Sequence, residues 1–85
     1  MADAPVTLNF PDYPPARYSA LRLVLVQKGL RLDGNEGQIK EFGADVSYAY
    51  DGVTNLTLLV RSAPHWHSMK GFEDGLKAAI NGVAN

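Results

Sequence analysis

The sequence predicts one α+β domain in which two helices pack on one face of a small antiparallel sheet of three to four strands. Three observations support this fold class. Short segments alternate apolar and polar side chains with the period of a strand, and turn residues separate them. One longer segment carries helix start and stop signals, and another carries an apolar arc of helical period. We expect the order β-α-β-β-β-α within a single domain, residues 1–85.

Composition and charge limit the classes of function. Of the 85 residues, 46% are hydrophobic and 20% are charged, which is ordinary for a globular chain. The formal net charge of -1 provides no field that would attract nucleic acid or an anionic membrane, so we expect neither as a partner. The sequence has no cysteine, which excludes disulfides and thiolate zinc sites. The first residues lack the regions of a leader peptide, so we expect a soluble cytoplasmic protein, although a mature secreted form carrying an added Met would look the same.

Residues 6–10 and 15–28 are predicted to form the first strand and the first helix. The strand follows from the alternation of apolar and polar side chains. Two prolines at the helix start and Gly29 just after its end are typical helix boundaries. Residues 21–26 also partly alternate and are rich in β-branched side chains, so a strand is the competing interpretation there. As a helix, the segment has Val26 on its polar side, which leaves an apolar surface to be covered.

Residues 30–50 are expected to supply the next two strands. A turn at residues 34–37 would pair Leu32 with Ile39 and place both on one face of the sheet. A longer alternating segment then predicts the best strand of the chain, with the apolar members Phe42, Ala44, Val46, Tyr48 and Tyr50. The first member of this stripe and Ile39 have opposite parity, so we predict a bulge within residues 40–43.

An Asp-Gly pair at the start of residues 51–53 predicts a hairpin. A two-residue loop would set the apolar face of one strand against the polar face of the next, so we predict a three-residue loop. That register pairs Tyr48 with Leu56 and Val46 with Leu58.

The second helix is predicted to begin near His67 or Ser68 and to end near Ala84. Its apolar arc consists of Trp66, Met69, Phe72, Leu76, Ala79, Ile80 and Val83. A separate strip contains only small residues, namely Gly71, Gly75, Ala78 and Gly82. Each interior glycine costs about 1 kcal/mol relative to alanine in a helix, so we expect another backbone to pack closely on this strip. The alternative is a marginal surface helix that tolerates the glycines.

This order of elements resembles the ferredoxin-like arrangement in outline, without its final strand. The resemblance rests on element order alone, and no sequence motif accompanies it. It therefore implies a fold and no chemistry.

Two histidines before the second helix form the most distinctive local pattern. His65 and His67 would lie on one side of an extended backbone, and imidazole is a common metal ligand. Nothing specifies a third ligand, so we predict no metal or other cofactor. Ser68 and Lys70 add a hydroxyl and a cation near the helix start, which makes the four residues a candidate site for an anion or small ligand. The alternative is that one of them caps the helix while Trp66 packs beneath it.

No catalytic residue is predicted, because a serine near a histidine lacks the orienting group and oxyanion hole of a hydrolase. A chain this short buries a limited core, which a partner would supplement. We expect a non-catalytic interaction module that binds protein, most simply a second copy of itself as a homodimer. The expected interface residues are Val26, Gly71, Gly75, Ala78 and Gly82. The alternative is a small-ligand, anion or metal-binding domain that uses residues 65–70.

Overall fold

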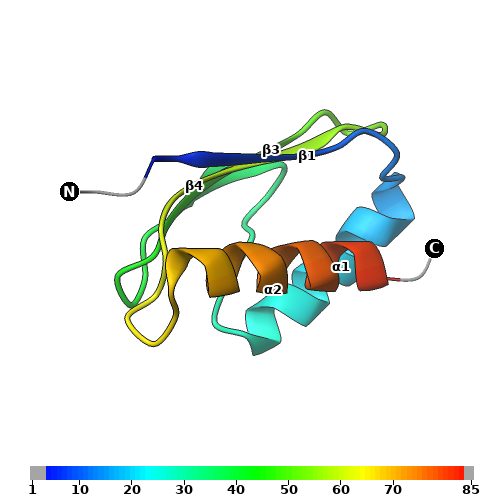
Figure 1. Cartoon of the computed structure of the whole chain (residues 1–85). Helices are drawn as coiled ribbons and strands as arrows, with labels where there is room; N and C mark the ends of the chain where they lie inside the picture. The colour runs from blue at the N-terminus through cyan, green and yellow to red at the C-terminus, as the bar shows by residue number, and fades with distance from the viewer. Residues whose placement is uncertain (1–3, 84–85) are drawn as a thin grey trace.

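The computed structural model describes residues 4–83 and has the predicted α+β class and element order. The elements are β1 (Val6–Phe10), α1 (Pro15–Gln27), β2 (Glu36–Ile39), β3 (Asp45–Tyr50), β4 (Leu56–Ser62) and α2 (Met69–Gly82). The four strands form one antiparallel sheet in the order β1-β4-β3-β2. Both helices lie on the same side of this sheet, below it in the view of Figure 1. Two layers therefore enclose the core, and the opposite sheet face is polar.

Strand β1 lies at one edge of the sheet and pairs with β4, almost fifty residues away in sequence. Leu8 is opposite Leu58 and Val6 is opposite Val60, so their apolar side chains face the helices together. On the other sheet face, Thr57 and Asn9 are joined through their side chains at 3.3 Å. The predicted strand at residues 6–10 is confirmed, and the period-two pattern assigns its faces correctly.

The segment after Pro14 is helical, as predicted, and not a strand. Pro15 opens α1 and the helix ends at Gln27; Gly29, with φ of 82°, follows in the left-handed conformation. Leu21 and Leu25 are buried against the sheet, whereas Val26 is 48% exposed. Burial of one side of the helix against the sheet therefore stabilises it by more than the β-branched residues of the segment destabilise it.

The predicted pairing of Leu32 with Ile39 is wrong. Leu32 belongs to an irregular segment, while Ile39 ends β2 and pairs with Val46 of β3. Leu32 is nevertheless buried. The Tyr48 hydroxyl accepts a hydrogen bond from Asp33 N at 2.6 Å and donates one to Asp33 O at 3.1 Å. A core tyrosine therefore satisfies backbone groups of this segment, and no strand partner is needed for its leucines to reach the core.

The predicted bulge within residues 40–43 is also wrong, because these residues form part of the turn between β2 and β3. Ala44 N donates to Glu41 O at 2.9 Å, and Phe42 and Gly43 both have positive φ. Because a turn follows Ile39, the alternation of one strand does not have to continue into the next. Phe42 therefore does not face the core with the other apolar residues, and its side chain is exposed. A register shift does occur nearby, between Asp45 and Val46 in the pairing of β3 with β4.

The hairpin register differs by two residues from the prediction. Tyr48 pairs with Leu58, and Val46 pairs with Val60, across a loop of residues 51–55. One carboxylate oxygen of Asp51 accepts backbone hydrogen bonds from the three residues Val53, Thr54 and Asn55. This side-chain cap stabilises a longer loop than the Asp-Gly pair alone suggests. A shift of two residues preserves the faces, which is why the predicted core positions remain correct.

Helix α2 begins after Ser68, whose hydroxyl accepts a hydrogen bond from Gly71 N at 3.0 Å. Phe72, Leu76 and Ile80 are buried, which confirms most of the predicted apolar arc. Trp66 does not belong to this arc, because it precedes the helix and is 61% exposed. The helix ends at Gly82, and the predicted end near Ala84 lies outside the described residues.

The small-residue strip of α2 does not receive a closely packed backbone from within residues 4–83. A Cβ added at Gly75 or Gly82 would meet nothing within 4 Å, and one at Gly71 would meet side-chain atoms of residues 67 and 68. Ala78 is likewise exposed. The strip is thus a surface of the molecule, and the helices are joined elsewhere, at the end of α1 that carries Arg17.

Candidate functional site

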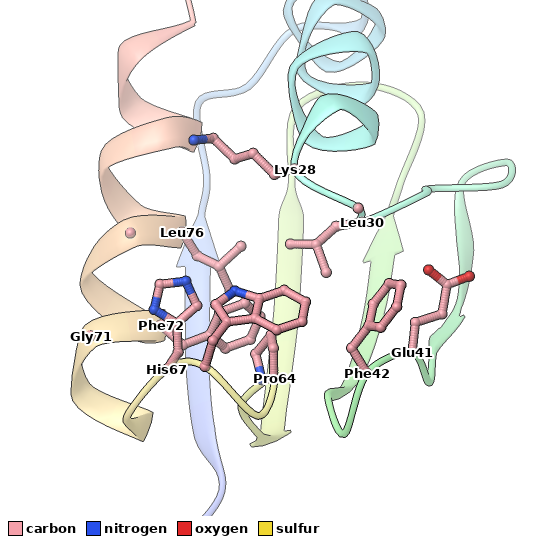
Figure 2. A pocket seen from close by; sticks show the side chains of 12 residues that line it. Lys28, Leu30, Glu41, Phe42, Pro64, His67, Gly71, Phe72 and Leu76 are labelled. Atoms are coloured by element: carbon pink, nitrogen blue, oxygen red, sulfur yellow. The ribbon is translucent and has the colours of Figure 1, made fainter.

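A pocket of about 320 Å³ opens at the end of the molecule where α1 finishes and α2 begins. Four segments line it: the residues that follow α1, the turn between β2 and β3, the loop between β4 and α2, and the first turns of α2. Leu30, Phe72 and Leu76 supply apolar surface from the core, and Figure 2 shows them around the cavity. A volume near 300 Å³ is at the lower end of the range typical of small-molecule sites.

Two exposed aromatic side chains form one wall of this pocket. Phe42 is 58% exposed and Trp66 is 61% exposed, although both are large and apolar. Their ring centroids are 5.3 Å apart, and the ring planes are tilted by 51°. Each ring therefore shields part of the other, while the remaining aromatic surface faces solvent and the cavity. Neighbouring exposed aromatics of this size commonly mark interaction surfaces.

The backbone holds Phe42 in an unfavourable conformation. Its φ of 55° makes it the one non-glycine residue with positive φ among residues 4–83. A bulky residue in this region costs roughly 1–2 kcal/mol. The carbonyl of Phe42 accepts a hydrogen bond from His65 N at 2.9 Å. This bond links the β2–β3 turn to the loop that carries Trp66, so the two aromatic residues are positioned together.

Gly43 permits the close approach of these two loops. A Cβ at Gly43 would lie 2.6 Å from His65 Cε1, and the glycine φ of 89° suits few other residues. The Ser62 hydroxyl also donates to Gly43 O at 2.8 Å. The loops that present the aromatic wall are therefore fixed by two hydrogen bonds and one close packing contact.

The α2 wall of the pocket is open because two of its residues lack side chains. Gly71 and Gly75 lie one turn apart, and each directly precedes a buried residue, Phe72 or Leu76. At Gly75 a side chain would extend into open space, so no contact within residues 4–83 requires glycine there. An interior glycine costs a helix about 1 kcal/mol relative to alanine. The missing side chain leaves space that forms part of the pocket.

Three ionisable side chains border the pocket: Lys28, Glu41 and His67. None of the three makes a side-chain hydrogen bond or ion pair to another residue in the described range 4–83. Figure 2 shows Lys28 extending from the end of α1 toward α2, and the Glu41 carboxylate on the side of the Phe42 ring that is remote from α2. The rim thus has basic groups near α2 and an acidic group beyond the aromatic wall.

The four residues proposed from sequence as an anion or ligand site point to different surroundings. His65 packs against Gly43, whereas His67 lines the pocket with its ring 6.0 Å from that of Phe72. Ser68 caps α2, and the Lys70 ammonium pairs with Asp74 at 3.3 Å. Of the four, His67 alone lines the pocket. Anion binding by the set stays a prediction, and within residues 4–83 no three potential metal ligands come together.

The residues predicted for a protein interface are divided among separate surfaces, and Gly71 lines the pocket described above. Val26 borders a shallow hollow on the outer side of α1, next to Leu23 and Arg22. Gly75, Ala78 and Gly82 line a different groove, between the two helices. Sequence reasoning missed Lys28, Leu30 and Phe42 as pocket residues. The sequence feature that could have identified Phe42 is the change in alternation between Ile39 and Phe42. An exposed turn explains this change as well as a bulge does.

The groups with perturbed pKa values lie away from the pocket. Burial raises the pKa of the Tyr13, Tyr18 and Tyr50 phenols, and each phenol donates a hydrogen bond to a backbone carbonyl. Hydrogen bonds from Asn55, Val53 and Thr54 lower the pKa of Asp51, which holds the hairpin loop together. These shifts therefore report structural roles.

Comparison with known proteins supplies no assignment: no family model, no curated protein and no solved structure matches this chain. A search of the described helices for one long and apolar enough to cross a membrane also found none.

Proposed function

We propose that this protein is a non-catalytic binding domain, and that its site is the pocket walled by Phe42 and Trp66. The observation that carries the proposal is the pair of exposed aromatic rings beside a cavity of about 320 Å³. The rings remain exposed although burying a side chain of this kind contributes about 2 kcal/mol. An apolar ligand in the pocket would remove this surface from water.

Two further features support a binding site that is formed in advance. The turn that carries Phe42 is held by the His65–Phe42 backbone hydrogen bond and by the contact between His65 and Gly43. A preformed site loses little conformational entropy when a ligand enters. Gly75 also lines the pocket, where alanine would raise helix propensity and its Cβ would meet no atom within 4 Å.

A non-catalytic role is supported by the chemistry of the pocket lining. The residues that border it comprise apolar groups, glycines and the three ionisable side chains of Lys28, Glu41 and His67. Nucleophilic catalysis needs a nucleophile within hydrogen-bond reach of a base that is itself oriented. The lining residues that could act as a nucleophile, Lys28, Glu41 and His67, make no side-chain hydrogen bond or ion pair within residues 4–83 that would activate or orient them.

Trp66 allows a direct test, because it is the only tryptophan of the chain and lines the pocket. We would titrate the protein with octanol, a small neutral apolar probe, and follow tryptophan fluorescence. We expect a saturable change in the wild type. The substitution Gly75→Leu fills the pocket from α2 and should abolish the change while leaving the protein folded.

Ala78→Leu is the matched control, since Ala78 is exposed on the same helix and does not line this pocket. Its titration should reproduce that of the wild type, and circular dichroism should show all three proteins folded. The proposal is wrong if wild type gives no saturable response, or if Gly75→Leu responds as wild type does.

A second candidate function is self-association through the outer side of α1. Leu23 is 67% exposed and Val26 is 48% exposed, and both border one hollow together with Arg22. Light scattering at micromolar concentration should then give a dimer, and Val26→Glu should give a monomer. A monomeric wild type at the highest accessible concentration would exclude this second function and leave the pocket proposal unaffected.

A further inference from the structure

We infer that the pocket binds a small apolar carboxylate, with the hydrocarbon part against Phe42 and Trp66 and the carboxylate between Lys28 and His67. The inference rests on the proposed function and adds the chemical class of the ligand. It follows from the arrangement of charge around an otherwise apolar cavity.

The basic groups of the rim are on the side of α2. The Lys28 side chain extends from the end of α1 toward α2, across the upper part of the cavity in Figure 2. His67 lines the pocket from the loop that precedes α2, and its ring centroid is 6.4 Å from that of Trp66. An ammonium group offers three donors, and imidazole offers at least one N–H in either protonation state. Both groups are donors on the rim of one cavity, so a carboxylate placed between them can accept a hydrogen bond from either.

Neither basic side chain has a competing partner among residues 4–83. Two other lysines, Lys70 and Lys77, pair with acidic residues of α2 at 3.3 Å and 2.8 Å, whereas Lys28 makes no such pair. Glu41, the acidic group of the rim, has its carboxylate beyond the Phe42 ring and away from α2. A negative ligand group on the α2 side is therefore next to cations and separated from the glutamate.

The size of the cavity favours a small molecule over a protein segment. Specific protein interfaces bury about 800 Å² on each partner, and they are flatter than a pocket of this volume. A cavity of about 320 Å³ encloses a small ring or a short alkyl chain with its head group at the rim.

Three probes that share one alkyl tail test the charge preference: octanoate, octanol and octylammonium. Trp66 fluorescence at low ionic strength should show octanoate binding roughly fivefold more tightly than octanol, as expected for a charge pair at a partly exposed rim. Octylammonium should bind more weakly than octanol. Lys28→Gln should bring the octanoate affinity down to that of octanol and leave the octanol affinity unchanged.

Lys40→Gln is the control, because it removes the same charge from an exposed lysine that does not line the pocket. It should preserve the preference for octanoate. Equal binding of octanoate and octanol, or tighter binding of octylammonium, overturns the inference while the proposed binding function stands. An equal loss of octanoate preference in Lys40→Gln and Lys28→Gln also overturns it. Failure of all three probes to bind would instead refute the proposed function itself.

Discussion

Both ends of the molecule carry aromatic residues, but these are buried at one end and exposed at the other. At one end, where α1 begins and α2 finishes, the Tyr13 hydroxyl donates to Ile80 O at 2.9 Å and the Tyr50 hydroxyl donates to Tyr13 O at 2.6 Å. Arg17 lies over the Tyr13 ring and donates to Val83 O at 2.7 Å. At the other end, Phe42 and Trp66 are exposed beside a cavity.

The contrast distinguishes an end that stabilises the fold from the end that carries the proposed binding site. The Tyr13 end has its aromatic rings buried and their polar atoms hydrogen bonded, so it links both helices to the sheet. The Phe42 end leaves apolar surface uncovered and contains a strained residue. Preformed binding sites usually sacrifice some stability in this way. Substitutions at the two ends should accordingly affect different measurements.

The largest difference is expected between Tyr13→Ala and Phe42→Ala. Tyr13 is 1% exposed, so its truncation leaves a cavity and removes hydrogen bonds, which should lower the free energy of unfolding by about 4 kcal/mol. Phe42→Ala removes an exposed side chain and should lower it by less than about 1 kcal/mol. Urea denaturation followed by circular dichroism measures both. Equal losses would contradict the division between the two ends.

Gly43→Ala should be the most damaging single change at the end that carries the pocket. The added Cβ would lie 2.6 Å from the His65 ring, and alanine is strained at a φ of 89°. We expect a loss of about 2 kcal/mol in unfolding free energy, mainly from backbone strain, together with a weaker octanol response, because the His65 ring must move and the turn that carries Phe42 is strained. Gly34→Ala, at a φ of 82° with nothing near the Cβ, separates backbone strain from the loop contact.

Tyr50→Phe removes one buried hydrogen bond and should cost about 1.5 kcal/mol. Burial raises the pKa of the Tyr50 phenol, so the folded state favours the neutral form. This contribution is complete below the unfolded tyrosine pKa of about 10 and is lost as the pH rises through the folded pKa. Denaturation at about pH 8 and about pH 11 should therefore show a smaller alkaline loss in Tyr50→Phe than in wild type. An identical loss in both proteins would remove Tyr50 as a contributor.

The smallest expected effect has the opposite sign. Gly75→Ala should raise the free energy of unfolding by about 1 kcal/mol, because alanine favours the helix and its Cβ meets no atom within 4 Å. A destabilised Gly75→Ala would show that the glycine has a structural role in the fold. The same substitution should slightly weaken octanol binding, which sharpens the link between this glycine and the pocket.

Much of the architecture could be predicted from local sequence patterns. Alternation assigned the inward faces of β1, β3 and β4, and the prolines and glycine around α1 defined its limits to within one residue. The error in pairing at residues 30–39 arises because burial of Leu32 does not require pairing with another strand. Local periodicity reports which side chains are buried and does not report which backbone groups pair.

The candidate site could be predicted in part only. His67 was selected from sequence, and the glycines of α2 were recognised as costly, but they were assigned to contact with another backbone. Phe42 was assigned to the core because it continues an apolar stripe. Whether a parity break becomes a bulge or a turn depends on the loops that pack beside it, and these come from residues distant in sequence.

By itself, the sequence determined the α+β class, the order of elements, the faces of the strands and the limits of the first helix, since these depend on periods and end signals within a few residues. The hairpin register, the exposure of Phe42 and Trp66, and the cavity beside these two rings depend on the tertiary structure. These features depend on contacts such as that between His65 and Gly43, which join segments some twenty residues apart. A local sequence pattern cannot predict these features, because the interactions that decide between alternative loop and strand arrangements form only when distant segments pack together.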